Sequence, residues 1–427
     1  MENSPSHATG LRKTLSLPHI VTLYIGAVIG SGVLLLPGLA AEIAGPASIL
    51  AWLFMTILVL PMAITMGLLS ARHPSSGGVS TFVRMVYGDF AGNLVGWFFL
   101  LSVPIGAPIV AVTASHYAAV LLDWSPLQVY LAAGMILVAV IIMNIFGLQV
   151  ASKVQTIVVG LIAAILVLAV ISAIPHASVS HFTPFVPQGW LSVLQVAGLL
   201  FWCFIGWEAV THLSEEFVDP EKNAVRGVLR SAGIVALLYF SVALLTVATH
   251  SYGEGRSEAS LSVMVQLSLG PAGGWVVGIT ALFICVATVN AYVGAASRIA
   301  YALARQGSAP RWFGHLHRTY QTPVGGLFFL AICFSLVLTV LALEWIDLTR
   351  LIQFPNATFF ATYIGGCLAG VRLLKNSRYG RLAAWTSLIV TVSLYPFLGW
   401  SALYPLAIAA VLLLVERQKQ SSRTRSM

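Results

Sequence analysis

Three glycines fall within seven residues of the first long apolar run, at Gly26, Gly30 and Gly32. Each glycine costs a helix about 1 kcal/mol relative to alanine, so Gly30, Ser31 and Gly32 favour an unwound segment between two half-helices. Gly26 alone favours close helix packing. The same packing is the alternative for the whole stretch, because small residues let helices approach closely in lipid.

An unwound segment supplies both kinds of group that hold a free amino acid. The N–H groups and the positive dipole end of the second half-helix bind a carboxylate. The carbonyls freed at the end of the first half-helix accept hydrogen bonds from an ammonium group. The stretch 30–32 therefore predicts a site for the zwitterionic end of an amino acid.

A further glycine, Gly206, interrupts the sixth apolar run and precedes Glu208, the one acid deep within any predicted span. An acid inside a membrane is costly unless paired or hydrated, and it is functional by default. Glu208 is predicted to carry a proton or to sense pH, with a structural hydrogen bond as the alternative. Large apolar side chains beside it are predicted to wall the pocket: Phe201, Trp202 and Phe204.

Two interrupted runs, five runs apart, indicate an inverted-repeat transporter. The repeats are predicted at about 16–174 and 190–374, followed by two helices at about 381–416. In the tenth run Asn356 follows Pro355, and it lines the pocket or gate or else joins two helices. Asn290 and Tyr292 in the eighth run favour hydrogen bonding between helices.

The composition indicates that these residues lie on helices that span a membrane. The 427 residues are 58% hydrophobic and 8% charged, whereas soluble proteins carry about 25% charged residues. Twelve apolar runs are each long enough for a helix that crosses the bilayer, and they lack the alternation of barrel strands. The fold is predicted to be all-α, with spans at 16–41, 47–71, 89–122, 126–146, 151–174, 190–214, 226–250, 271–303, 323–345, 350–374, 381–398 and 400–416.

The net charge of +8 could suggest a nucleic-acid partner, but its distribution excludes one. With twelve spans, all Lys and Arg residues except Arg256 and Arg350 fall on one side, which is the positive-inside pattern. A multi-pass protein of the bacterial inner membrane is predicted, with both termini cytoplasmic. An N-terminal tail at 1–15 and a basic tail at 417–427, suited to anionic lipid, would flank a transporter domain at 16–416.

No metal, cofactor or catalytic constellation is predicted. The cysteines lie inside apolar runs without a CxxC pair, which indicates neither disulfides nor zinc. HExxH and GxSxG motifs are absent and no two acids meet at membrane depth, which disfavours an enzyme. A channel would show a repeated pore motif or a charge ring. The four cysteines are Cys203, Cys285, Cys333 and Cys367.

Four stretches, in order and spacing, resemble the amino acid–polyamine–organocation (APC) superfamily over nearly the whole chain. The run Phe201–Phe204, His212-Leu213 before Ser214-Glu215, and Asn356 are most similar to its bacterial branch that exports methionine and branched-chain amino acids. The four stretches are Gly30-Ser31-Gly32-Val33 leading to Pro37; Pro74-Ser75-Ser76-Gly77-Gly78 with Gly88, Gly92, Gly96 and Trp97; Phe201 to Glu208 continuing to Glu216 and Asp219-Pro220; and Arg298-x-x-Tyr301-x-x-Ala304-Arg305-Gln306-Gly307-x-x-Pro310.

The resemblance implies a five-plus-five inverted repeat (the LeuT-like APC fold) with broken first and sixth helices and alternating access. It places the substrate carboxylate on the backbone around Ser31 and Gly32. The ammonium would meet carbonyls near Val28, Trp202 and Ile205, beside Gly206.

The resemblance also implies that Trp202 walls the pocket and helps to close an outer gate, and that Glu208 matches an acid linked to pH sensing. In one respect this sequence departs from the pattern. Some relatives carry a lysine in the fifth helix that replaces sodium, but here the neighbourhood is apolar, at 158–161, and Lys153 lies nearer the cytoplasmic end.

The predicted function is export of methionine, leucine, isoleucine and valine, driven by proton antiport. An uptake permease or exchanger of the same fold is the alternative. The predicted partners are the amino acid, protons and membrane lipid, and the sequence leaves both a monomer and a homodimer open.

Overall fold

The computed structural model describes residues 11, 13–30, 32–122, 124–253, 257, 260–346, 351 and 353–425. These residues are almost entirely helical, and their one β-bridge joins Leu15 to Phe217. The helices are α1 (Leu17–Val28), α2 (Gly32–Ala44), α3 (Ser48–Arg72), α4 (Val79–Tyr87), α5 (Asp89–Leu122), α6 (Pro126–Ile145), α7 (Leu148–Ala173), α8 (Trp190–Leu200), α9 (Pro220–Ala248), α10 (Ser260–Leu269), α11 (Ala272–Arg305), α12 (Val324–Ala342), α14 (Gln353–Leu373), α15 (Arg378–Leu394) and α16 (Leu403–Arg425).

The predicted all-helical membrane fold is confirmed, including its two interrupted helices. The first run forms α1 and α2, and the sixth forms α8 followed by two 3₁₀ segments, η4 (Phe201–Phe204) and η5 (Ala209–Glu216). Nine stretches of the described chain are long and apolar enough to cross a membrane, and the longest, Gly32–Arg72, contains both α2 and α3.

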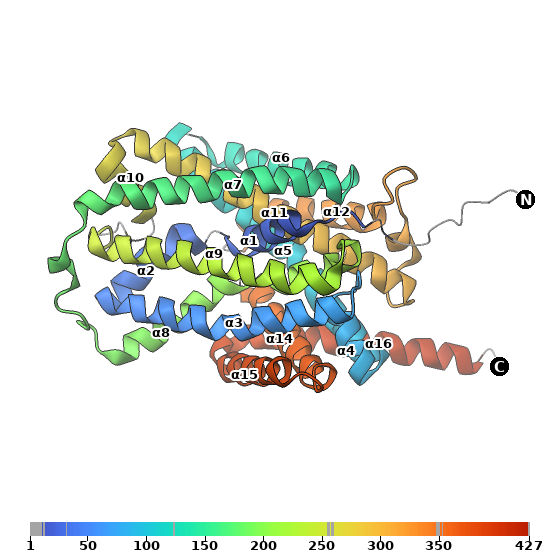
Figure 1. The fold of residues 1–427 in the computed structure, drawn as a ribbon. Helices are drawn as coiled ribbons and strands as arrows, with labels where there is room; N and C mark the ends of the chain where they lie inside the picture. Colours follow the sequence, from blue (N-terminus) through green and yellow to red (C-terminus); the bar gives the residue numbers. More distant parts are fainter. Residues whose placement is uncertain are drawn as a thin grey trace, which may run out of the picture.

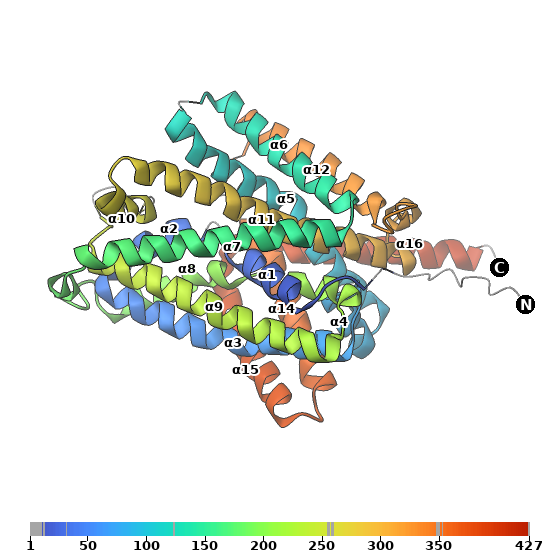
Figure 2. The ribbon, with the colours of Figure 1, turned by 45° about the horizontal axis from the view of Figure 1, so that its top comes forward.

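The helices form one elongated bundle (Figures 1 and 2). α3, α7 and α9 run along its length, and α5 and α11, with 34 residues each, cross its centre. α6 and α12 form one edge and α15 the opposite edge (Figure 2). α1 begins and α16 ends towards the same end of the bundle, which we call the terminal end (Figure 1).

Local sequence sets several of the helix boundaries. Pro126 and Pro220 each occupy the first position of a helix, where the missing N–H costs nothing. Ser125 and Gln128 form a capping box that starts α6. Near the C-terminus, α16 continues to Arg425 and so includes most of the range 417–427, which was expected to be a tail. The residues 417–425 contain no glycine or proline to end the helix.

Candidate functional site

The first helix break lies where the glycines predict it. α1 ends at Val28, Ile29 leaves the helical conformation with ψ 83°, and α2 begins at Gly32. The amide of Gly30 donates to the carbonyl of Val28 at 2.8 Å, and the hydroxyl of Thr288 on α11 donates to the carbonyl of Ile29 at 3.1 Å. Ser31, the middle residue of the predicted site, lies outside the described residues.

The second break lies between η4 and η5, at Ile205–Glu208. Gly206 has φ +135°, a conformation that favours glycine. A Cβ atom there would lie 2.7 Å from the carbonyl oxygen of Ala27, so the two breaks are in direct contact. This contact places the end of α1 against the gap in the sixth run.

Tyr239 of α9 ties the two breaks together, and the sequence interpretation did not identify it. Its hydroxyl lies 2.8 Å from the carbonyl of Val28 and 3.2 Å from the carbonyl of Cys203. Its ring packs edge-on against Trp52 and Phe204. Val28, proposed for the ammonium, therefore already accepts hydrogen bonds from both Tyr239 and Gly30.

A cavity adjoins both breaks and is bounded by α5, α11 and α14. Among the described residues that line it, no side chain is charged. The lining residues are Ala27, Val28, Gly30, Gly32, Val103, Gly106, Ala107, Val110, Trp202, Cys203, Ile205, Thr288, Val289, Tyr292 and Phe359.

The predicted pocket wall is only partly brought to this cavity. Trp202 lines it, whereas the ring of Phe201 stacks on Phe360 at 4.1 Å. Phe204 packs against Trp52 of α3, with ring centroids 6.2 Å apart, and is not a lining residue. Residues three apart in a 3₁₀ helix lie on one face, so Trp202 points in a different direction from the two phenylalanines.

Asn356 is not among the lining residues either. It lies one turn before Phe359 and Phe360 on α14 and is partly exposed. Its side-chain oxygen is buried and has no hydrogen-bond partner within the described part of the chain.

Glu208 is fully buried beside the second break and does not line the cavity. Its Oε2 accepts the N–H of Gly206 at 3.0 Å, and the Tyr363 hydroxyl lies 3.2 Å from the same nitrogen. The Tyr292 hydroxyl donates to Oε1 of Glu208 at 3.4 Å. Tyr292 also lines the cavity, so it connects the cavity to the acid. A role limited to helix–helix bonding was therefore an incomplete interpretation of Tyr292.

Asn290 does bond between helices, as its interpretation from sequence favoured. Its amide donates to the side chain of Gln155 at 2.8 Å and accepts from Asn144 at 2.9 Å, which joins α6, α7 and α11. Gln155 also donates to the carbonyl of Ala287 at 2.9 Å. A Cβ atom at Gly26 would lie 1.7 Å from the Gln155 amide nitrogen, so Gly26 packs closely as expected. Through Gln155, α7 thus presents a neutral amide to α1 and α11.

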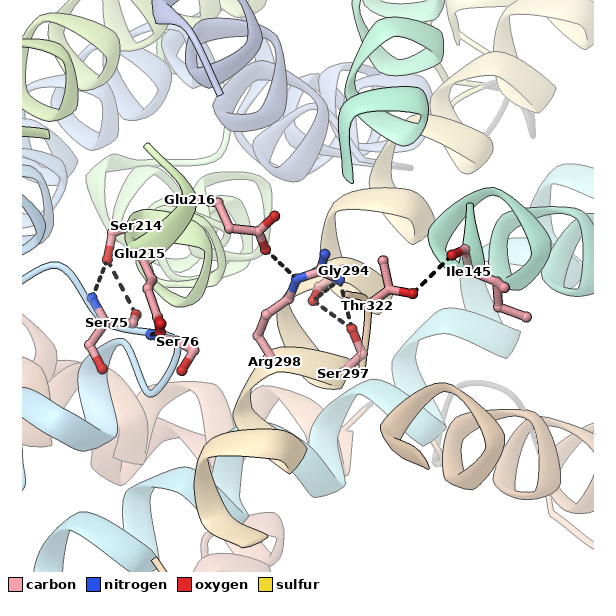
Figure 3. A network of polar contacts seen from close by, with 10 residues as sticks. All are labelled: Ser75, Ser76, Ile145, Ser214, Glu215, Glu216, Gly294, Ser297, Arg298 and Thr322. Atoms are coloured by element: carbon pink, nitrogen blue, oxygen red, sulfur yellow. Dashed lines mark hydrogen bonds and ion pairs between the residues drawn. The ribbon is translucent and has the colours of Figure 1, made fainter. Parts of the chain in front are cut away.

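At the terminal end, a network of polar contacts surrounds the end of the sixth run (Figure 3). Nε of Arg298 on α11 donates to Oε1 of Glu216 at 2.8 Å, and both side chains are buried. On the other side of η5, the backbone N–H groups of Ser75 and Ser76 donate to Ser214 Oγ and to Oε2 of Glu215, each at 3.0 Å. The end of the sixth run is therefore held both to α11 and to the loop after α3.

The chemistry that this arrangement supports is recognition of a small molecule. Unwound backbone beside an uncharged cavity offers polar groups for one end of a ligand and an apolar space for the other. Within the described residues, no group of three or more His, Cys, Asp and Glu side chains could hold a metal ion.

Comparisons with known proteins identify the family of this chain. The chain is 38% identical over 400 residues to the uncharacterized amino acid permease YecA of Bacillus subtilis (strain 168), covering 94% of both chains. It is 31% identical over 417 residues to the L-methionine/branched-chain amino acid exporter YjeH of Escherichia coli (strain K12), covering 96% of this chain and 98% of the relative.

The fold is that of a solved transporter structure. MhsT in complex with L-phenylalanine aligns with a TM-score of 0.69 at 14% identity, covering 92% of this chain and all of that one. A family model described as amino acid permease matches residues 15–424. The chain therefore belongs to the amino acid permease family of the APC superfamily, whose members are multi-pass membrane transporters.

Proposed function

We propose that this protein is a secondary active transporter that exports neutral hydrophobic amino acids by alternating access. The observation that carries the proposal is the uncharged lining of the cavity next to the two helix breaks. A charged substrate side chain would be buried there without a partner, which is costly. An aliphatic or thioether side chain would bury only apolar surface, which is favourable.

In the proposed binding mode, the breaks hold the zwitterion. The carboxylate would lie at the start of α2, near Gly30 and Gly32, where the helix dipole favours an anion. The ammonium would lie near the carbonyls of Trp202 and Ile205. Val28 lies at the same place, but its carbonyl already accepts hydrogen bonds from Tyr239 and Gly30.

Counterflow in proteoliposomes tests the substrate class. Vesicles loaded with unlabelled methionine or leucine should accumulate the labelled amino acid in a saturable manner, and an excess of arginine or glutamate should not compete. Non-saturable flux would indicate a channel. The absence of flux for every amino acid would contradict the proposal.

The direction of transport is proposed from the exporter among the relatives, and the orientation of the protein in the membrane from its charge distribution. Basic residues gather in the loops at the terminal end, which would make that end cytoplasmic. Overexpression in cells should lower internal methionine and leucine and confer resistance to their toxic analogues. Greater sensitivity to the analogues would instead indicate an uptake permease.

Proton antiport is proposed to involve Glu208. This acid contacts the second break directly and reaches the cavity through Tyr292. Binding or release of a proton would change the hydrogen bonds that the carboxyl makes to Gly206 and Tyr292. Protonation could in this way be linked to the shape of the site.

A further inference from the structure

One face of α5 forms a wall of the cavity and contributes no polar side chain to it. Val103, Gly106, Ala107 and Val110 all line the cavity. Their spacing of three, four and seven residues puts them on a single face of the helix. This wall offers hydrocarbon only, and at Gly106 it offers no side chain at all.

Gly106 differs from the glycines at the breaks in the space around it. A Cβ atom at Gly32 would lie 2.4 Å from Sγ of Cys203, and one at Gly206 would lie 2.7 Å from the Ala27 carbonyl. At Gly106 the nearest atom would be Cβ of Pro355 at 3.9 Å, an ordinary van der Waals distance. Packing therefore requires the first two glycines and does not require Gly106.

A glycine that packing does not require still destabilises the helix that contains it. In the interior of a helix it is less favourable than alanine by about 1 kcal/mol. Gly106 lies in the middle of the 34-residue helix α5, and it carries no positive φ that would call for glycine. What the missing side chain leaves at this position is space within the cavity.

We infer that Gly106 sets the upper size limit for the substrate side chain, which occupies the space beside α5. The inference rests on the proposed function and makes it more specific. It assigns the zwitterion to the breaks and the apolar side chain to the wall formed by Val103, Gly106 and Val110. Larger residues at 106 should therefore exclude large aliphatic and thioether substrates while retaining small ones such as alanine.

The expected effect is a change in selectivity. One methylene group in an apolar pocket is worth roughly 10–200-fold in discrimination. Gly106→Ala should weaken the binding of methionine and leucine, relative to that of alanine, by about tenfold, and Gly106→Val should weaken it by about a hundredfold. The Ala variant needs no rearrangement of Pro355, so it should fold even if the Val variant does not.

The test measures inhibition constants for glycine, alanine, valine, leucine, methionine and phenylalanine against counterflow in proteoliposomes. Gly160 provides the matched control, because it is an exposed helical residue of α7 with no atom within 4 Å of an added Cβ. Gly160→Ala and Gly160→Val should leave the order and the ratios of the constants unchanged. Thermal unfolding midpoints check that each variant is folded.

The outcomes separate this inference from the proposed function. If the Gly106 variants lose affinity for large substrates and keep it for small ones, the inference about Gly106 is supported. Equal weakening of all substrates, or unchanged ratios, would overturn the inference while the wild-type protein still transports neutral amino acids. Failure of the wild-type protein to exchange any amino acid would contradict the proposed function, and the inference with it.

Discussion

Arg298 and Glu216 form a buried ion pair between α11 and the end of the sixth run, with Nε 2.8 Å from Oε1. The side chains are 1% and 6% exposed. Nη1 of Arg298 also donates to Ser297 Oγ at 2.9 Å. Because removing one partner leaves a buried charge uncompensated, we expect the loss of either side chain to open the packing at the terminal end.

Glu216→Gln is therefore expected to weaken closure of the terminal end. Breaking one side of a buried pair costs about 3–5 kcal/mol, so the thermal unfolding midpoint should fall and a soluble thiol reagent should reach Cys203 faster. Glu216→Leu combined with Arg298→Met removes both charges and should recover much of the stability.

A partly exposed ion pair at the same end serves as the control. Arg84 lies 3.2 Å from Asp89, whose side chain is 83% exposed. Asp89→Asn should change stability by less than about 1 kcal/mol. If Glu216→Gln behaved like this control in both measurements, the buried pair would have no part in closing the terminal end.

Glu208→Gln is expected to flatten the dependence of transport on pH. The amide keeps a group that can bond to Gly206 and Tyr292 but cannot bind or release a proton. The measurement is the counterflow rate between about pH 5 and 8. Tyr292→Phe keeps the acid and its hydrogen bond to Gly206 but removes the contact with the cavity, so the pH dependence should weaken without disappearing. An unchanged profile in Glu208→Gln would return Glu208 to a structural role.

Tyr239→Phe is expected to loosen the junction of the two breaks. It removes the hydroxyl that contacts the carbonyls of Val28 and Cys203, at a cost of about 1 kcal/mol. Substrate affinity should fall, and the thermal midpoint should fall slightly. Tyr395→Phe is the matched control, because that hydroxyl bonds to Ala402 in η8 (Tyr395–Ala402), away from the breaks. Equal affinity losses in both variants would contradict the assignment.

Cys203 is expected to report on occupancy of the cavity. All three of Cys203, Cys285 and Cys367 are buried, but only Cys203 of these lines the cavity. In a variant with Cys285, Cys333 and Cys367 changed to alanine, alkylation should block transport, and methionine should slow alkylation while arginine does not. Alkylation at the same rate with and without methionine would show that substrate does not occupy this cavity.

The helix breaks could be predicted because glycine acts locally. Gly30 and Gly206 interrupt apolar runs, and the structure breaks both helices there. Tyr239 and Tyr363 could not be identified in the same way. A tyrosine in an apolar run resembles a packing residue, and only the contact between distant helices places its hydroxyl at the breaks.

The directions of the side chains could not be predicted from the sequence either. The run Phe201–Phe204 predicts a helix, but which of its faces meets the cavity depends on where the other helices pack, and the sequence does not show this. Gln155 was overlooked although a polar residue within the fifth apolar run was a visible signal. Its significance lies in Asn290 and Ala287, which are more than a hundred residues away in the sequence.

The β-bridge between Leu15 and Phe217 has a practical consequence for anyone who labels this protein. The amides of Thr14 and Leu15 donate to the carbonyl of Glu216, and Val218 donates back to Leu15 at 2.8 Å. A fluorescent protein or affinity tag fused just ahead of Leu15 would therefore pull on the residue that pairs with Arg298. A reporter attached beyond α16 avoids that strain.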